Sequence, residues 1–162
     1  MLTQTRLKEV FSYSERTGLF TRISKTGCKG VIGAVAKSKI NGYVVMGIDG
    51  RRYGAHRLVF LYVTGSWPKF DVDHKNGVTD DNRWVNLRDV THVENMQNLR
   101  GPRSDNKSGY LGVTWNEKCQ KWRAQIKTGD KKRLHIGMFE RPELAHHAYL
   151  KAKREHHVGC TI

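Results

Sequence analysis

The stretch Asp73-His74-Lys75-Asn76-Gly77 is the most informative part of the sequence. An acidic side chain, an imidazole and a glycine turn follow one another there. Amide side chains recur after it at Asn82, Asn86 and Asn95. Carboxylate and amide oxygens are hard ligands suited to Mg²⁺ or Mn²⁺. An imidazole with a pKa near ~6.5 is mostly neutral at pH 7 and can accept a proton from water. The stretch therefore predicts a metal centre beside a general base.

The sequence around this stretch predicts a strand, a loop, a return strand and a helix. Alternation of apolar and polar residues favours a first strand that presents Asp73 and His74 at its end. Thr91 and Glu94 have the spacing of a capping box, in which each side chain satisfies a backbone N–H at a helix start. The predicted elements are a strand over 70–74, a polar loop over 75–83, a return strand over 85–90 and a helix ending at about 99.

Taken together, these residues resemble the HNH (ββα-metal) nuclease motif in the form found in phage and intron-encoded homing endonucleases. The likeness extends over roughly residues 40–100, and the joint spacing of its members makes it specific. The stretches that carry it are Asp73-His74, Asn76-Gly77, Asp81-Asn82-Arg83, Asn86-Leu87-Arg88, Thr91 and Glu94-Asn95, with Ala55-His56-Arg57-Leu58-Val59 upstream.

The resemblance implies a role for each principal residue of the motif. Asp73 and Asn95 would hold one divalent metal ion, Mg²⁺ or Mn²⁺. His74 would act as the general base that takes a proton from the attacking water. Asn86 would orient His74 by binding the other ring nitrogen and so setting the tautomer.

Three further residues are accessory candidates. An Asn amide is a weak metal ligand, so His92 and Asn98 are rivals of Asn95 for that position. His56 lies at the head of a predicted helix, where it either faces the substrate or serves as a hydrogen-bonded structural residue.

The residues upstream of the motif predict short strands on turns, followed by one buried helix. Asp49-Gly50 is a dipeptide typical of two-residue hairpins. The run from residue 56 to 63 is dense in apolar side chains, and Gly65 is suited to end a helix there. The expected strands cover residues 18–23, 43–48 and 52–55.

A change of composition separates this region from the rest of the chain. Residues 101–109 are rich in Gly, Pro, Ser and Asn and have no apolar side chain, which is typical of a flexible connector. We therefore expect a first domain over 1–100, a linker over 101–109 and a second domain over 110–162.

The second domain is predicted to hold three strands and one helix. The strands cover 110–115, 121–127 and 133–139, with a hairpin turn at 128–130 and a helix beginning at Pro142. Alternation gives the sheet one apolar face and one basic face. The apolar face is expected from Trp122, Ala124, Ile126, Leu134 and Ile136, and the helix covers it with Ala145, Ala148, Tyr149 and Ala152.

Residues 108 to about 159 resemble the APETALA-two/ethylene-response-factor DNA-binding domain. The stretches that carry the likeness are Ser108-Gly109-Tyr110-Leu111-Gly112-Val113, residues 121–126, residues 134–139, Pro142-Glu143-Leu144-Ala145 and Ala148-Tyr149. The resemblance implies a sheet that enters the DNA major groove. The residues expected to face DNA are Thr114, Arg123, Gln125, Lys127, Arg133 and His135.

Within that set, Arg133 is the best candidate for reading a guanine and Gln125 for reading an adenine. Leu111 and Thr114 replace arginines that are common in plant members of the family. The base contacts therefore differ, and no target sequence is transferred. A basic sheet without base specificity is the alternative.

Charge and composition point to a polyanionic partner. The 162 residues include 29 Lys and Arg against 15 Asp and Glu, a net charge of +14, which exceeds the magnitude of roughly 2 to 8 that solubility requires of a small domain.

No apolar run approaches the ~20 residues that span a bilayer, and residues 1–15 lack a signal-peptide core. We expect a cytoplasmic protein, in a bacterial host cell and of phage or mobile-element origin by the resemblance.

The cysteine and histidine patterns argue against a disulfide-bonded protein and against a zinc-binding module. Cys28, Cys119 and Cys160 are far apart and never in a Cys-x-x-Cys pair, so we expect free thiols and no Cys-ligated zinc. The histidines near the C-terminus have no usual zinc-ligand spacing; these are His146, His147, His156 and His157.

The expected fold class is α+β: a small ββα-metal module with N-terminal strands, plus a three-stranded antiparallel sheet packed on one helix. The expected activity is DNA endonuclease cleavage of double-stranded DNA. One active site attacks one strand, so a monomer would nick, and a double-strand cut would need a homodimer or two events. The alternative is a non-catalytic, sequence-specific DNA-binding protein with a vestigial centre.

Overall fold

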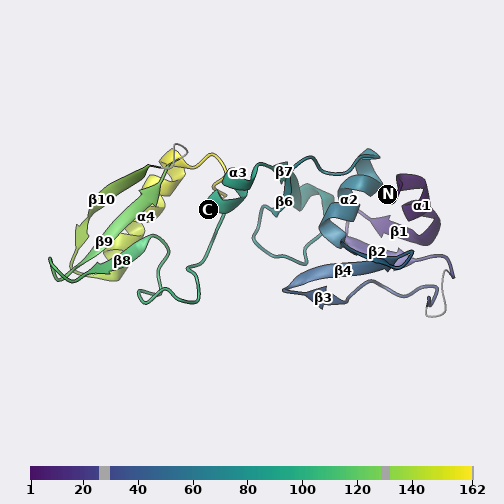
Figure 1. Cartoon of the computed structure of the whole chain (residues 1–162), viewed down its shortest axis with the longest axis horizontal. Coiled ribbons are helices and arrows are strands. Elements are labelled where there is room, and N and C mark those ends of the chain that lie inside the picture. The colour runs from purple at the N-terminus through teal and green to yellow at the C-terminus, as the bar shows by residue number, and fades with distance from the viewer. Residues whose placement is uncertain (26–29, 129–131, 162) are drawn as a thin grey trace. The chain divides into compact units, whose positions relative to one another are not determined.

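The chain, seen in a computed structural model that describes residues 1–25, 30–128 and 132–161, is a mixed α/β protein with small antiparallel sheets (Figure 1). Contacts between residues divide it into two units, Met1–Val90 and Thr91–Ile162. The predicted connector 101–109 falls inside the second unit by this division. The predicted domain bounds therefore remain a prediction, and each unit is described by itself.

Three small antiparallel sheets build the described part of the first unit. Strand β1 pairs with β2, strands β3, β4 and β5 form a sheet in that order, and β6 pairs with β7. In chain order the elements are α1 (Gln4–Val10), β1 (Phe11–Ser14), β2 (Leu19–Arg22), β3 (Lys39–Ile40), β4 (Tyr43–Ile48), β5 (Arg51–Gly54), α2 (Ala55–Thr64), β6 (Asp71–His74), the 3-10 turn η1 (Trp84–Asn86) and β7 (Leu87–Val90).

Helix α2 is the centre of the first unit's core, as its dense apolar composition predicted. Leu58, Val59 and Leu61 are at most 2% exposed. They belong to one hydrophobic cluster with side chains of α1, of β2 and of β4. Gly65 ends the helix in the left-handed conformation at φ 79°, so the predicted stop is confirmed.

The N-terminus differs from the strands expected there, because residues 4–10 form the helix α1. Thr3 caps it, and its hydroxyl accepts a hydrogen bond from the N–H of Arg6 at 3.2 Å. Leu7 and Val10 are fully buried. The helix is too short to be stable by itself, so this packing stabilises it, and seven residues of sequence carry too little periodicity to predict it.

The second unit has the predicted three strands followed by a helix. The strand order is β10-β9-β8, all antiparallel, and the turn predicted at 128–130 lies mostly outside the described residues. Val113, Ala124 and Ala145 are buried between the sheet and the helix. The elements of this unit are α3 (His92–Gln97), β8 (Val113–Asn116), β9 (Lys121–Lys127), β10 (Arg133–Phe139) and α4 (Pro142–His156).

Two details of the second unit depart from simple alternation. The register of β10 against β9 shifts between His135 and Gly137, so the strand carries a bulge. Leu134, expected in the core, is 41% exposed, whereas Ile136 at the bulge packs against the core. Trp122 packs at the edge of the core, only partly buried.

We predict that Gly18→Ala destabilises the first unit more than Gly33→Ala. Both glycines have positive φ, 72° and 83°, so both substitutions cost about 1–2 kcal/mol of backbone strain. An added Cβ at Gly18 would also lie 2.5 Å from the backbone nitrogen of Arg83, whereas nothing lies within 4 Å of one at Gly33. The total for Gly18→Ala is therefore expected to reach about 3 kcal/mol or more.

Urea unfolding of both full-length variants measures this difference. Equal loss of unfolding free energy in the two variants would show that the close approach at Gly18 has no energetic weight.

Candidate active site

Strands β6 and β7 hold the acidic member of the motif in a buried ion pair. Asp73 is directly opposite Arg88 in the register of the two strands. Its Oδ2 accepts hydrogen bonds from Nε of Arg88 at 2.8 Å and from Nη2 at 2.7 Å. Asp73 is only 7% exposed, and such a buried carboxylate is tolerated because it is paired.

The imidazole of His74, the next residue on β6, is oriented by Asn82. His74 is 4% exposed, and its Nε2 lies 3.3 Å from Oδ1 of Asn82. Nδ2 of Asn82 donates to the carbonyl of Asp80, so the amide oxygen is the atom that faces the ring. The contact therefore requires the proton on Nε2 and leaves the lone pair of a neutral imidazole on Nδ1.

Asn86, which we expected to orient His74, binds the loop between β6 and β7 instead. Its Oδ1 accepts from the N–H of Asn76 at 3.0 Å, and its Nδ2 donates to the carbonyl of Asp81 at 2.8 Å. Nδ2 of Asn76 in turn donates to the Asp81 carboxylate at 2.7 Å. Asn86 thus closes the loop into a fixed shape, and the loop presents Asn82 to the ring.

The same loop is tightened by an ion pair two residues apart. Arg83 donates to the Asp81 carboxylate at 2.8 Å from Nε and at 2.6 Å from Nη2. These bonds hold the pKa of Asp81 at about 2. Asp81 is therefore ionised across the whole physiological range, and the loop keeps its shape there.

The hairpin of β1 and β2 supports the loop from outside. The hydroxyl of Tyr13 donates to the backbone carbonyl of Asn82 at 2.7 Å, and burial raises the pKa of Tyr13 to about 12. Gly18 lies so close to the backbone of Asn82 and Arg83 that no side chain fits between them. The N-terminal strands are therefore part of the scaffold of the site.

Two rings surround His74 and make its environment apolar. Its ring centroid lies 5.9 Å from that of Tyr43 and 5.6 Å from that of His56, and those two are 5.2 Å apart. Burial lowers the pKa of His74 below its usual range. A lowered pKa keeps the ring neutral near pH 7, as a general base requires.

His56 is a neutral residue of this cluster. Burial first, then the nearby charges of His74 and Arg57, lower its pKa to about 4. Its Nδ1 is buried and has no hydrogen-bond partner among the described residues. The structure thus places His56 against the general-base candidate, whereas the sequence left its role open.

Tyr43 and Asn82 are residues of this cluster to which sequence reasoning assigned no role. Asn82 was visible as part of the motif, yet spacing does not tell which of its side-chain atoms faces His74. Tyr43 comes from β4, far upstream, and only the tertiary fold of the first unit brings its ring to that of His74. No local signal in the sequence identifies it.

The remaining motif residues lie in the second unit. Asn95 is on α3, His92 is the first residue of that helix and Asn98 follows its end. Asn98 is 5% exposed, and its Oδ1 accepts a hydrogen bond from the Thr161 hydroxyl, which uses the oxygen that a metal would need. The ligand roles of all three remain predictions.

The donor set suits a hard divalent cation. Asp73 offers a carboxylate and Asn95 an amide oxygen, and neither is a soft ligand. The described residues contain no group of three or more His, Cys, Asp or Glu side chains that could hold a metal ion.

The basic face of the second unit's sheet gathers all six residues that we expected to face DNA. Cross-strand neighbours are Thr114 and Arg123, Gln125 and His135, and Lys127 and Arg133. Opposite residues of an antiparallel pair lie on the same face. Lys127, Arg133 and His135 are exposed, and the other three are half-buried. The face is therefore continuous and positively charged.

Two of the three cysteines lie in the described part of the chain. Cys119 and Cys160 form no disulfide there, and Cys28 lies outside the described residues. None of the helices in the described part of the chain has the length and apolar character needed to cross a membrane.

We predict that His56 makes the first unit lose stability as pH falls from about 6.5 to about 4. The folded pKa of His56 is below the unfolded value of ~6.5, so the unfolded chain binds more protons in that window. The loss attributable to His56 is expected to reach on the order of 2–3 kcal/mol at pH 4.

Urea midpoints of the wild type and of His56→Gln at pH 7.0 and pH 4.5 measure this effect. The midpoint of the variant should fall less between the two pH values. Parallel decreases in the two proteins would exclude His56 as the source.

One comparison with known proteins finds a match. Residues 53–97 match the family model described as HNH endonuclease, a span that includes α2, β6, β7 and α3. Comparisons with curated proteins and with solved structures return no match. The matched segment contains Asp73, His74 and the loop that orients His74. The match supports an HNH nuclease whose endonuclease domain includes residues 53–97.

Proposed function

We propose that the protein is a metal-dependent, homing-type DNA endonuclease that hydrolyses phosphodiester bonds with His74 as the general base. The observation that carries this proposal is the contact between His74 Nε2 and Asn82 Oδ1. It directs the lone pair of a buried, neutral imidazole to Nδ1, the atom that takes the proton.

In the proposed reaction, a water molecule attacks the phosphorus atom while Nδ1 of His74 removes its proton. The new phosphorus–oxygen bond forms as the bond to the leaving oxygen breaks, and that oxygen leaves with the electron pair. Asn82 keeps Nε2 protonated and favours the imidazolium that forms, and Asn86 maintains the loop on which Asn82 lies. Asn82 and Asn86 are thus positioning residues in this proposal.

A divalent ion, Mg²⁺ or Mn²⁺, would be held by Asp73 and Asn95. When bound, such an ion neutralises charge that develops on the phosphate and the leaving oxygen. Arg88 binds the Asp73 carboxylate and fixes it at the end of β6, which prepares it to act as a ligand.

The second unit is proposed to hold the DNA, as a sheet of the APETALA-two/ethylene-response-factor type in the major groove. The six residues of its basic face support this role, with Arg133 and Gln125 as the base-reading candidates. The net charge of +14 favours a polyanion as partner. With one active site, a monomer would nick one strand.

We predict that His74→Ala lowers Mg²⁺-dependent nicking of supercoiled plasmid by about 10²- to 10⁴-fold, because the general base is lost. Asn82→Ala is expected to lower the rate by about 10- to 100-fold by releasing the ring. His147→Ala, which alters an exposed histidine of α4, is the control and should cleave normally.

DNA affinity measured in chelator should change less than about twofold in all three variants, because none of these residues is proposed to hold the duplex. Full activity of His74→Ala would contradict the mechanism. Absence of cleavage by the wild type, with intact binding, would instead support a non-catalytic DNA-binding protein.

We predict that Lys127→Ala makes duplex binding less dependent on salt. If Lys127 contacts a phosphate, its removal lowers the magnitude of the log–log salt slope by about 0.9. Lys151→Ala, on the exposed side of α4, removes the same charge away from the sheet and should leave the slope unchanged. Binding titrations in chelator between 50 and 200 mM salt, a range over which such slopes are roughly linear, measure it. Identical slopes for both variants would show that Lys127 contacts no phosphate and that the DNA binds at another surface.

A further inference from the structure

Helix α3, which carries Asn95, has little packing of its own. It is six residues long, and none of them is buried. Val93 is 53% exposed and Met96 is 46% exposed. Helices this short are not stable in water without tertiary contacts. Something other than an apolar face must therefore hold α3 in place.

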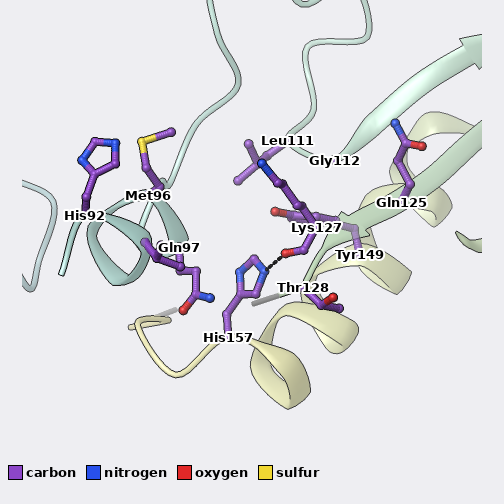
Figure 2. A pocket seen from close by; sticks show the side chains of 11 residues that line it. His92, Met96, Gln97, Leu111, Gly112, Gln125, Lys127, Thr128, Tyr149 and His157 are labelled. Carbon is purple, nitrogen blue, oxygen red and sulfur yellow. Dashed lines mark hydrogen bonds between the residues drawn. The ribbon is translucent and has the colours of Figure 1, made fainter. Parts of the chain in front are cut away.

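A cleft of about 550 Å³ lies beside α3 within the second unit. Figure 2 shows side chains of α3, among them Met96, on one side of it and Leu111 and Tyr149 on the other. A cleft of that size means that α3 is not packed against the sheet and α4 along its length. Among the described residues, the C-terminal end of the chain forms hydrogen bonds with the end of α3.

The attachment consists of Lys153 and residues 157–161, which we call the C-terminal clamp. The N–H of Gly159 donates to Oε1 of Gln97 at 3.0 Å, and Nζ of Lys153 donates to the carbonyl of Leu99. Lys153 is only 1% exposed, and burial lowers its pKa. An ammonium so buried needs a fixed acceptor, and the end of the α3 segment supplies it.

The last residues of the clamp continue the same contact. The hydroxyl of Thr161 donates to Oδ1 of Asn98, and Nη2 of Arg100 donates to the hydroxyl of Thr161 at 2.8 Å. Side chains and backbone from 153 to 161 thus bind four consecutive positions, 97 to 100, at the end of α3.

Gly159 is where the clamp approaches α3 most closely. A Cβ added there would lie 2.3 Å from the backbone oxygen of Glu94 and 2.9 Å from its Cα. Both atoms belong to the helix backbone, which cannot turn aside as a flexible side chain would. No positive φ is involved, so the requirement for glycine comes from this contact alone.

The clamp is itself anchored to the sheet of the second unit. Nε2 of His157 donates to the carbonyl of Lys127 at 2.8 Å, a bond drawn in Figure 2. The N–H of His157 donates to the carbonyl of Lys153, and the N–H of Cys160 donates to the carbonyl of His157. The chain that follows α4 is therefore fixed to β9, the strand that carries three of the proposed DNA contacts.

We propose that the C-terminal clamp positions the helix of the nuclease motif. Lys153 and Gly159 are positioning residues in this inference. They fix α3, and therefore Asn95, relative to the rest of the second unit. The inference rests on the proposed function for its effect on cleavage. It means that the second unit is needed for the cutting step as well as for holding DNA.

The direct test is Gly159→Ala in the full-length protein, with Gly101→Ala as the matched control. Gly101 also has no positive φ, and a Cβ there meets nothing within 4 Å. Two amides report on α3, because the N–H of Asn95 donates to Thr91 and that of Asn98 donates to Glu94. Their hydrogen exchange should be at least ~10-fold faster in Gly159→Ala and unchanged in Gly101→Ala.

Function is measured on the same two variants. Nicking by Gly159→Ala should fall at least ~10-fold, and the Mg²⁺ concentration for half-maximal rate should rise, because a displaced ligand binds the ion less well. DNA binding in chelator should stay within about twofold of the wild type.

Each outcome decides a separate point. Unchanged exchange in Gly159→Ala would overturn the clamp itself. Faster exchange with normal nicking would overturn the positioning role. If the wild type does not nick at all, the proposed function fails, and the exchange result still decides whether the clamp holds α3.

A second variant covers the case in which Gly159→Ala loses DNA binding and so has not folded. Lys153→Met keeps the length and apolar stem of the side chain and removes the ammonium that binds the carbonyl of Leu99. The same readings are then applied to it. Exchange and nicking equal to those of the wild type would overturn the inference.

Discussion

The hydrogen bond between His74 and Asn82 is the interaction on which the nuclease site depends. It is weak by itself at 3.3 Å, and its direction comes from the loop around it. Asn86 closes that loop, the ion pair of Asp81 and Arg83 tightens it, and Tyr13 binds it from the N-terminal hairpin. Because each of these bonds restricts the backbone of Asn82, the amide meets the ring in one orientation, which preorganises the residue that we propose as the general base.

Burial acts in the same direction as that bond. The rings of Tyr43 and His56 exclude water from one side of His74, and desolvation disfavours a charged imidazole. Asp73 lies in a different environment, because its carboxylate forms an ion pair with Arg88. Asp73 and His74 are adjacent on one strand, and the alternation of the strand directs their side chains to opposite faces, so the two have separate environments.

The outline of the fold could be predicted from local patterns. The capping box at Thr91 and Glu94, the stop of α2 at Gly65 and the three strands of the second unit each depend on a few neighbouring residues. Helix α1 could not be predicted, since its stability comes from contacts with distant segments. Leu134 was misplaced because a bulge interrupts the alternation that placed it in the core.

By itself the sequence determined the chemistry of the site: a carboxylate beside an imidazole, amides at motif spacing and a basic sheet. Only the tertiary structure decided which amide serves which atom. Asn86 and Asn82 are the same residue type four positions apart, and their roles differ because the loop turns one inward to its own backbone and the other toward His74. The directions of the two side chains determine these roles. Those directions depend on the path of the whole loop and on the hairpin that supports it.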